Sequence, residues 1–457
     1  MALKVIEFAR VSPAQDSTRG SAYSLNLPLI FFDLPWLRFH PVERVFFYRL
    51  TDSTRELFES VILPRLKHSL SGVLRHFLPL AGRITWDPQE PKPSIVVSEN
   101  DTVSLTVAVT GADLSRVSGN GQRQESELRL LVPELPVSDD SASVVSLQIT
   151  LFPSQGFCIG MAGHHAVLDG KTASMFIKAW AHTCKQHQEH ENIGPVPLPD
   201  DLTPSFDRSL IKDLTNLDAK MLELLSSFTQ HKTLKLFSPL EIGPDVVRVT
   251  LELTRQNIEK LRERVKNELP SHQGHHLSSF VIAYAYLWTC FVNARGGDAH
   301  RPVALIFVAD YRHRFDPPLP ATYFGNCIYP VICHDKTAGA FMEEKGFGTA
   351  VQILSDMVKS LESRRMETIP EEFEEGFKSA RRVSQLGSAA GSTRLGIYGS
   401  DFGWGRPDKV EIISIDQSEA FSMAEKRDGE VGGIEMGLCL EKREMDKVVS
   451  LFNDGLN

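Results

Sequence analysis

A histidine and an aspartate four residues apart are the side chains of this sequence best suited to proton-transfer chemistry. They are His165 and Asp169, in the run Gly-His-His-Ala-Val-Leu-Asp-Gly at 163–170. Histidine accepts and returns a proton near neutral pH, because its unperturbed pKa is about 6.5. His165 is therefore a candidate general base. In the alternative interpretation, His165 is an ordinary structural histidine and Asp169 caps the helix that follows it by accepting a bond from a backbone N–H.

The elements around this run predict where it lies. Residues 145–151 alternate between apolar and polar side chains, the pattern of a half-buried strand. Residues 153–156 predict a turn and residues 157–162 the next strand, and apolar residues at helical spacing over 172–180 predict a helix. His165 is thus expected just past the end of a strand, where open α/β sheets place ligand chemistry.

Two motifs in the second half of the chain change the balance between these interpretations. Residues 401–405 read Asp-Phe-Gly-Trp-Gly, and residues 323–327 read Tyr-Phe-Gly-Asn-Cys, which alone would indicate only a glycine-centred turn. Together with His165 and Asp169, the first motif resembles the HxxxD and DFGWG motifs of the plant BAHD acyltransferases. The second is similar to the YFGNC signature of the clade that acylates anthocyanins and other flavonoid or phenolic glycosides. Residues 27–33 and 78–83 are similar to further family segments, so the resemblance covers essentially all 457 residues.

The resemblance implies a fold and a reaction. The fold would be α/β, with two chloramphenicol-acetyltransferase-like domains, mixed sheets and a channel between them. His165 would be the general base that deprotonates an acceptor hydroxyl, which attacks the thioester of an acyl-CoA co-substrate, and no acyl-enzyme would form. Asp169 would turn away from the channel and pair with Arg312, which would fix the loop that carries His165.

The resemblance leaves two interpretations of the motif at 401–405. The indole N–H of Trp404 could donate to the oxyanion, a contribution on the order of 3 kcal/mol. Alternatively, the whole motif, including Asp401, is a structural loop on the CoA side of the channel. The segments similar to family regions near CoA contain Ser278, Ser279, Ser392 and Arg394, each of which can equally belong to a turn or a helix cap.

The length, the composition and the turn-forming residues of the chain predict its domain organisation. A chain of 457 residues with 42% hydrophobic residues exceeds the usual size of one core. We expect an N-terminal domain at 1–190, a crossover segment at 191–235 and a C-terminal domain at 236–457. The strands expected in the second half are 246–253, 302–309 and 410–414, and the helices are 255–268, 278–292, 348–363 and 371–383.

Several classes of partner and compartment are excluded. A net charge of -9 disfavours a nucleic-acid surface. The first ten residues carry charges where a signal peptide needs an apolar core, and the apolar stretch at 280–292 is too short to span a bilayer. Six cysteines without a CxxC pair predict a reducing compartment, so we expect a cytosolic protein with small-molecule substrates. The lack of coiled-coil heptads or an obvious interface segment predicts a monomer. No metal is expected, because the polar neighbours of His182, His187 and His190 indicate a solvated helix end or a linker.

The acyl donor is the least determined feature. A malonyl carboxylate would favour a nearby cation, for which Lys171, Arg208 and Arg314 are candidates. A coumaroyl or caffeoyl donor would instead need an apolar, aromatic-lined slot. Because 395–405 and 205–209 are most similar to malonyltransferases of flavonoid glucosides, we expect malonyl transfer from malonyl-CoA to a sugar hydroxyl, the 6-hydroxyl of glucose, on an anthocyanin, flavonoid or phenolic glucoside.

Three alternatives stand beside this expectation. Hydroxycinnamoyl transfer to the same acceptors differs only in the CoA ester consumed. An inactive relative that binds acyl-CoA or a glycoside belongs to a different functional class. Residues 164–170 also resemble peptide-synthetase condensation domains, against which the motif at 401–405 and the lack of a carrier-domain segment argue.

Overall fold

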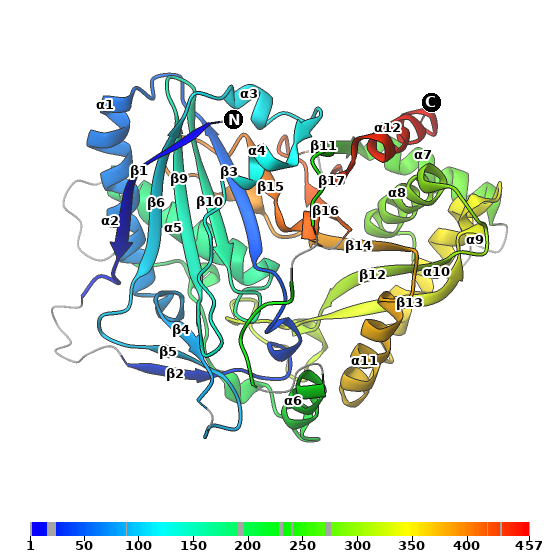
Figure 1. Cartoon of the computed structure of the whole chain (residues 1–457), viewed down its shortest axis with the longest axis horizontal. Coiled ribbons are helices and arrows are strands. Elements are labelled where there is room, and N and C mark those ends of the chain that lie inside the picture. Colours follow the sequence, from blue (N-terminus) through cyan, green and yellow to red (C-terminus); the bar gives the residue numbers. More distant parts are fainter. Residues whose placement is uncertain are drawn as a thin grey trace.

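The computed structural model describes residues 2–15, 24–87, 89–189, 196–227, 232–238, 241–269, 276–417, 419–429 and 432–456. Their strands form three sheets. Figure 1 shows the N-terminal half of the chain (blue to teal) beside the C-terminal half (green to red). The mixed α/β architecture predicted from the sequence is confirmed, whereas a continuous channel between the halves stays a prediction.

The helices and strands have the following bounds. The strands are β1 (Leu3–Val11), β2 (Leu25–Pro28), β3 (Val42–Arg49), β4 (Arg83–Thr85), β5 (Ser94–Val97), β6 (Val103–Thr110), β7 (Arg123–Gln124), β8 (Ser141–Ser143), β9 (Val145–Phe152), β10 (Gly156–Gly163), β11 (Val246–Leu253), β12 (Pro302–Asp310), β13 (Ile328–Thr337), β14 (Gln385–Ser392), β15 (Lys409–Ile412), β16 (Ala420–Glu425) and β17 (Ile434–Glu441). The helices are α1 (Arg55–Leu57), α2 (Leu63–Leu74), α3 (Leu114–Val117), α4 (Glu125–Arg129), α5 (Gly170–Glu189), α6 (Leu217–Ser227), α7 (Arg255–Glu268), α8 (Ser279–Arg295), α9 (Gly339–Met342), α10 (Gly346–Ser360), α11 (Ile369–Ala380) and α12 (Lys442–Asp454).

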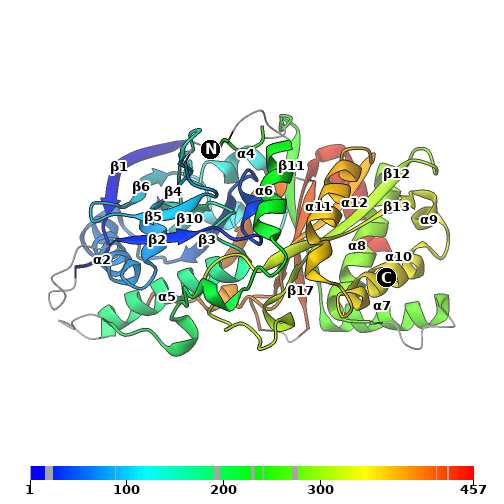
Figure 2. The ribbon, with the colours of Figure 1, turned by 90° about the horizontal axis from the view of Figure 1, so that it is seen from below.

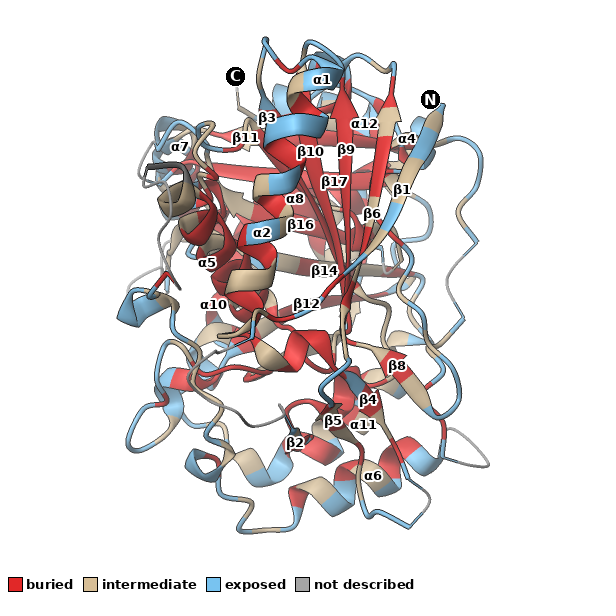
Figure 3. Ribbon diagram, turned by 90° about the vertical axis from the view of Figure 1, so that its left-hand side faces the viewer, coloured by how far each residue is buried: buried red, intermediate tan, exposed pale blue. Residues whose placement is uncertain are grey.

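A six-stranded sheet forms the core of the N-terminal half, in the order β1-β6-β9-β10-β3-β15. Only β6 and β9 run parallel. Helices α2 and α5 pack together over one face, and α2 turns its polar side to solvent (Figure 3). Strand β9 is buried on both faces rather than half-buried as predicted, because α3 and α4 cover the other face. Its Gln148 is satisfied there by donating to the carbonyl of Leu130, at 2.9 Å.

A seven-stranded sheet forms the C-terminal half, in the order β13-β12-β14-β16-β17-β11-β7. Strand β14 runs parallel to both neighbours, so this sheet is also mixed. Helix α8 is apolar on nearly every side and is enclosed by α7, α9, α10, α12 and the sheet, which confirms it as a buried core helix. No helix among the described residues combines the length and apolar character needed to cross a membrane.

The two halves exchange strands. Strand β7 comes from the first half of the chain and pairs with β11 in the second sheet, while β15 comes from the second half and pairs with β3 in the first. The four-stranded sheet β2-β5-β4-β8 and helix α6, which packs against α11 and residues 34–36 between the halves (Figure 2), were not predicted from the sequence. Helix α6 lies in the expected crossover segment. The domain limits 1–190, 191–235 and 236–457 themselves stay predictions.

The strands and helices expected in the second half of the chain agree with the structure to within three residues at each end, whereas α5 continues nine residues past the helix expected over 172–180. Strand β11 and helix α7 have the expected bounds, whereas α10 and α11 each begin two residues earlier and end three residues earlier than expected. Such elements are readily predicted because their apolar residues follow a regular period.

Candidate active site

The loop that carries His165 joins β10 to α5. Its chain turns tightly, since the N–H groups of Val167 and Leu168 both donate to the carbonyl of His164, at 2.9 and 3.1 Å. Asp169 then begins the helix, because its Oδ1 accepts from the N–H groups of Lys171 and Thr172, at 3.1 and 2.8 Å. The helix-cap interpretation is therefore correct for this oxygen of Asp169.

The other carboxylate oxygen of Asp169 faces the C-terminal half of the chain. Its Oδ2 lies 2.7 Å from Nη2 of Arg312, and both side chains are completely buried. Burial alone would raise the pKa of Asp169, but the charge of Arg312 and the bonds from Thr172 leave this pKa below its ordinary value. The structure thus brings together the two residues that the sequence paired, and Asp169 is an ionised carboxylate that links the two halves.

The Tyr-Phe-Gly-Asn-Cys motif wraps around the same loop. Nδ2 of Asn326 donates to the backbone carbonyl of His165 at 2.8 Å, and the N–H of Cys327 donates to Oδ2 of Asp169 at 3.4 Å. The carbonyl of Gly325 accepts from Nη2 of Arg312 at 2.9 Å and from the hydroxyl of Thr172 at 3.1 Å. The motif therefore fixes both the loop and the start of α5.

Asp33 supports this motif from the N-terminal half. Its Oδ1 accepts from the backbone N–H of Asn326 at 3.1 Å, and its Oδ2 lies 3.1 Å from Nη1 of Arg208, which also donates to the hydroxyl of Tyr323. The side chain of Asp33 is fully buried. Asp33 and Asn326 lie in segments that resemble family segments, but the sequence predicted no role for either residue. The only signal was their membership of those segments.

The imidazole of His165 lies between aromatic rings. Its ring stacks on that of Trp36, with centroids 4.3 Å apart and planes 8° apart, and Phe39 meets it edge-on at 6.1 Å. Nδ1 is buried without a partner. Nε2 also has no hydrogen-bond partner in the described part of the chain, but it is not fully buried. Burial, with a smaller contribution from His40, lowers the pKa of His165 to about 3. The imidazole is therefore neutral at pH 7, and an incoming proton donor can reach Nε2.

The contacts of Trp404 bear on its two interpretations. Its ring packs against Phe157 with centroids 5.8 Å apart, and Arg65 lies over it at 5.4 Å. Phe157 is the second residue of β10, whereas His165 lies two residues past the end of that strand. Six residues of strand rise by about 20 Å, so this packing favours the structural-loop interpretation of Trp404, and its oxyanion role stays a prediction.

The loop interpretation of the Asp-Phe-Gly-Trp-Gly motif fits the contacts. Oδ1 of Asp401 accepts from the N–H groups of Gly403 and Gly405, at 2.8 and 3.0 Å. Its Oδ2 lies 2.8 Å from Nζ of Lys185 on α5. Asp401 therefore shapes the loop and ties it to the helix that begins at the active site.

The four residues expected near CoA lie in two places, at the start of α8 and around the end of β14. Ser278 caps α8 by accepting from the N–H of Val281 at 3.3 Å, and Ser279 accepts from Arg262 at 3.1 Å. Phe280, at the start of α8, contacts Phe307 of β12, whose register partner on β14 is Ala389, three residues before Ser392. The start of α8 therefore lies close to the C-terminal part of β14.

The segment after β14 reaches the catalytic loop. A Cβ built on Gly170 would lie 3.4 Å from Cδ1 of Leu395, the neighbour of Arg394. Arg394 is exposed, and its N–H donates to the hydroxyl of Ser392 at 3.2 Å. The segment that follows Ser392 therefore contacts the start of α5, and a role of the four residues in CoA binding stays a prediction.

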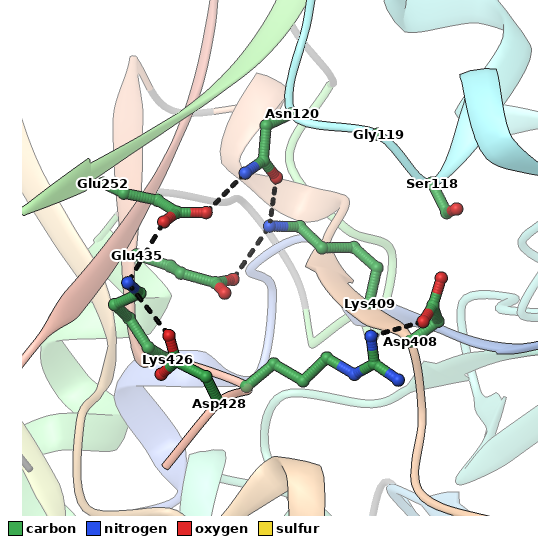
Figure 4. Close-up of a pocket in the computed structure, with 10 residues that line it drawn as sticks. Ser118, Gly119, Asn120, Glu252, Asp408, Lys409, Lys426, Asp428 and Glu435 are labelled. Carbon is green, nitrogen blue, oxygen red and sulfur yellow. Dashed lines mark hydrogen bonds and ion pairs between the residues drawn. The ribbon is translucent and has the colours of Figure 1, made fainter. Parts of the chain in front are cut away.

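A separate pocket of about 480 Å³ lies between the loop at 118–120 and residues 408–409 and 426–428. Figure 4 shows that its charged side chains bind one another. Lys409 pairs with Glu435 at 2.8 Å and Lys426 with Asp428 at 3.1 Å. None of the predicted site residues lines this pocket, and its paired charges offer little to an ionic ligand.

The cysteine and histidine clusters add no chemistry to the site. All six cysteines are free. Among the described residues there is no group of three or more His, Cys, Asp or Glu side chains that could hold a metal ion. His187 contacts His68 edge-on at 4.6 Å, and His190 lies outside the described residues.

Comparison with known proteins places this geometry in a family. The model of the Transferase family matches residues 1–454. The chain is 60% identical to phenolic glucoside malonyltransferase 2 of Arabidopsis thaliana, with 100% of both chains covered, and 50% identical to agmatine coumaroyltransferase of the same plant, with 99% of both covered. The crystal structure of vinorine synthase has the same fold, with a TM-score of 0.69, 20% identity and 98% of each chain covered. The chain therefore belongs to the Transferase family and is an acyl-CoA-dependent acyltransferase of the BAHD type.

Proposed function

We propose that this protein transfers the malonyl group of malonyl-CoA to a glucose hydroxyl of a phenolic glucoside, with anthocyanin and flavonoid glucosides in the same acceptor class. The observation that carries the donor and acceptor is the 60% identity, over the whole chain, to a protein named for this activity. The observation that carries the chemistry is the neutral imidazole of His165, whose Nε2 is free to accept a proton.

The reaction follows from this imidazole. Nε2 of His165 takes the proton of the acceptor hydroxyl while the hydroxyl oxygen attacks the thioester carbonyl carbon. The tetrahedral intermediate collapses, the carbon–sulfur bond breaks, and the imidazolium returns its proton to the CoA thiolate. The products are the malonyl ester and free CoA, and His165 is neutral again. No covalent acyl-enzyme is needed, because both substrates meet at one nitrogen.

The residues around His165 act through position rather than through contact with substrate. Arg312 holds Asp169, and Asn326 holds the carbonyl of His165. General-base catalysis requires hydrogen-bond distance between base and hydroxyl, so a small displacement of this loop costs rate. We therefore assign Asp169, Arg312 and Asn326 as positioning residues. We assign Ser278, Ser279, Ser392 and Arg394 to the CoA side.

A second donor class has a specific observation in its favour. A relative that is 50% identical over nearly its whole length is named as a coumaroyltransferase. The same fold and base would serve a hydroxycinnamoyl thioester, since only the pocket for the acyl group need differ. The donor must therefore be tested directly.

The compartment and the assembly also belong to this proposal. The six free cysteines fit the reducing cytosol, and we assign the protein there as a monomer that binds an acyl-CoA and a phenolic glycoside. Gel filtration at micromolar concentration tests the monomer.

The deciding experiment measures products by mass. Purified protein is given malonyl-CoA or p-coumaroyl-CoA with phenolic, flavonol and anthocyanidin glucosides, beside His165→Ala and the control His300→Ala, whose histidine is exposed at the far end of β12. We expect malonylated glucoside from the wild type and the control, and none from His165→Ala. Coumaroyl ester alone would replace the donor, and equal activity of His165→Ala would remove the base.

A further inference from the structure

Arg44 of strand β3 is an unpaired cation inside the protein. The described part of the chain holds five buried arginine or lysine side chains, which are Arg44, Arg123, Arg248, Arg312 and Lys409. The other four have a carboxylate oxygen within 3.5 Å. Among them Arg44, which is only 3% exposed, has no such partner.

The guanidinium of Arg44 is only partly satisfied by neutral groups. Nη1 donates to the hydroxyl of Ser174 at 2.9 Å, and Nη2 lies 3.5 Å from the carbonyl of Gly170. Nε is buried without any partner. A buried charge without a counterion is costly, and an anion that reaches it is bound more strongly than at an exposed cation.

Arg44 remains charged in this position. Burial lowers its pKa to about 10, against the charges of Asp169 and Glu425, neither of which lies within ion-pair distance. At pH 7 the group is therefore a full positive charge that no side chain neutralises directly.

The position of Arg44 connects it to the reaction. Nη2 would lie 3.3 Å from a Cβ built on Gly170, the residue directly after Asp169 and five after His165. Leu395, in the segment assigned to CoA, would lie 3.4 Å from the same built Cβ. Arg44, the start of α5 and the CoA segment therefore meet at one place beside the catalytic loop.

The three cations that the sequence suggested for this task are already engaged. Lys171 faces Asp310 at 4.0 Å, and Arg208 is paired with Asp33 at 3.1 Å. Arg314 donates to the carbonyl of Leu361 at 3.0 Å and lies over the ring of Tyr311. An anion at any of them would compete with an existing partner.

We propose that Arg44 determines donor specificity by binding the free carboxylate of the malonyl group while its thioester carbon is presented to His165. This inference rests on the proposed malonyl transfer and names the side chain that recognises the donor. The guanidinium fork matches the geometry of a carboxylate, and its unpaired Nε supplies a donor that the folded chain leaves unused.

The test compares two donors that differ only in this carboxylate. kcat/KM is measured with malonyl-CoA and acetyl-CoA for the wild type, Arg44→Met, Arg44→Lys and the control Lys171→Met. Methionine fills the same buried space without a charge, so folding should be retained, which thermal unfolding checks. We expect the kcat/KM of Arg44→Met to be about 10- to 100-fold lower than that of the wild type with malonyl-CoA and unchanged with acetyl-CoA. Arg44→Lys should lose less, and Lys171→Met should keep the wild-type ratio of the two donors.

The outcomes separate this inference from the function on which it rests. Equal losses with both donors in folded Arg44→Met would make Arg44 a structural residue and overturn the inference, with malonyl transfer intact. An unchanged ratio of the two donors in Arg44→Met would also overturn it. A wild-type protein that uses p-coumaroyl-CoA and not malonyl-CoA would overturn the proposed donor and this inference together.

Discussion

Replacement of Asp169 by asparagine should weaken folding and catalysis together. The variant keeps an oxygen for the helix cap, so the bonds from Lys171 and Thr172 can persist. It loses the charge that lies 2.7 Å from Arg312, and its amide N–H₂ would face the donors of Arg312 and Cys327. Removal of one partner from a buried ion pair costs about 3–5 kcal/mol. Because Arg312 keeps Asp310 at 3.2 Å and the carbonyl of Gly325, we expect the lower end, about 3 kcal/mol.

The effect on rate follows from the displaced loop. If the loop that carries His165 relaxes by a fraction of an ångström, kcat should fall by about 10- to 100-fold. Urea unfolding gives the free energy of unfolding, and initial rates with malonyl-CoA give kcat. The folded pKa of Asp169 is depressed, so its contribution to stability is present above the unfolded pKa, about 3.9, and is lost as the pH falls toward the lower folded pKa. The two proteins should therefore differ fully at pH 7 and converge only in strong acid.

A matched control lies on the same arginine. Asp310 also pairs with Arg312, at 3.2 Å, but its side chain is 38% exposed. Asp310→Asn should lower the free energy of unfolding by no more than about 1 kcal/mol, because exposed ion pairs contribute little to stability. Full stability and full activity of Asp169→Asn would refute the reasoning, and so would equal losses in the two variants.

Three further predictions concern the same machinery. Asn326→Ala removes the donor to the carbonyl of His165, so kcat should fall about tenfold with an unchanged KM for malonyl-CoA, and a raised KM with unchanged kcat in steady-state kinetics would contradict this. The acid limb of the kcat/KM profile should lie well below pH 6.5, because the base must be deprotonated and burial lowers the pKa of His165; a limb at or above pH 6.5 would exclude the buried, neutral imidazole. Trp404→Phe should leave turnover within about twofold of the wild type and lower stability by no more than about 1 kcal/mol through the lost contact with Arg65, whereas a hundredfold loss of turnover in the folded variant would restore the oxyanion role.

Local patterns predicted the elements that carry the site. The strand expected over 157–162 and the helical period after residue 170 located the strand and the helix on either side of His165, because regular elements leave a periodic pattern of apolar residues. The partner of Asp169 was identified correctly as Arg312. That pairing came from the family resemblance, since nothing in the spacing of two residues 143 positions apart indicates contact.

Features that depend on long-range packing were not predictable in this way. A motif does not indicate against which end of a strand its loop packs. For this reason Trp404 received a chemical interpretation beside the structural one, although it packs near the start of β10, at the end away from His165. The strand at 410–414 was expected, but not its pairing with β3 in the first sheet, and β7, with two residues, is too short to show a period. The role of Asn326 depends on a carbonyl 161 residues away and leaves no trace in composition.

The contacts also explain why the base and its support come from opposite halves of the chain. His165 and Asp169 follow β10, while Arg312 and Asn326 follow or precede strands of the second sheet. The bonds from Arg312 and Asn326 that fix the His165 loop therefore cross between the halves, and the exchanged strands β7 and β15 bring the same halves together elsewhere. The segment after β14 also contacts the start of α5, so the loop that carries the base is supported from the second half at both of its ends. A perturbation that loosens the interface far from His165 should accordingly lower kcat before it unfolds either half.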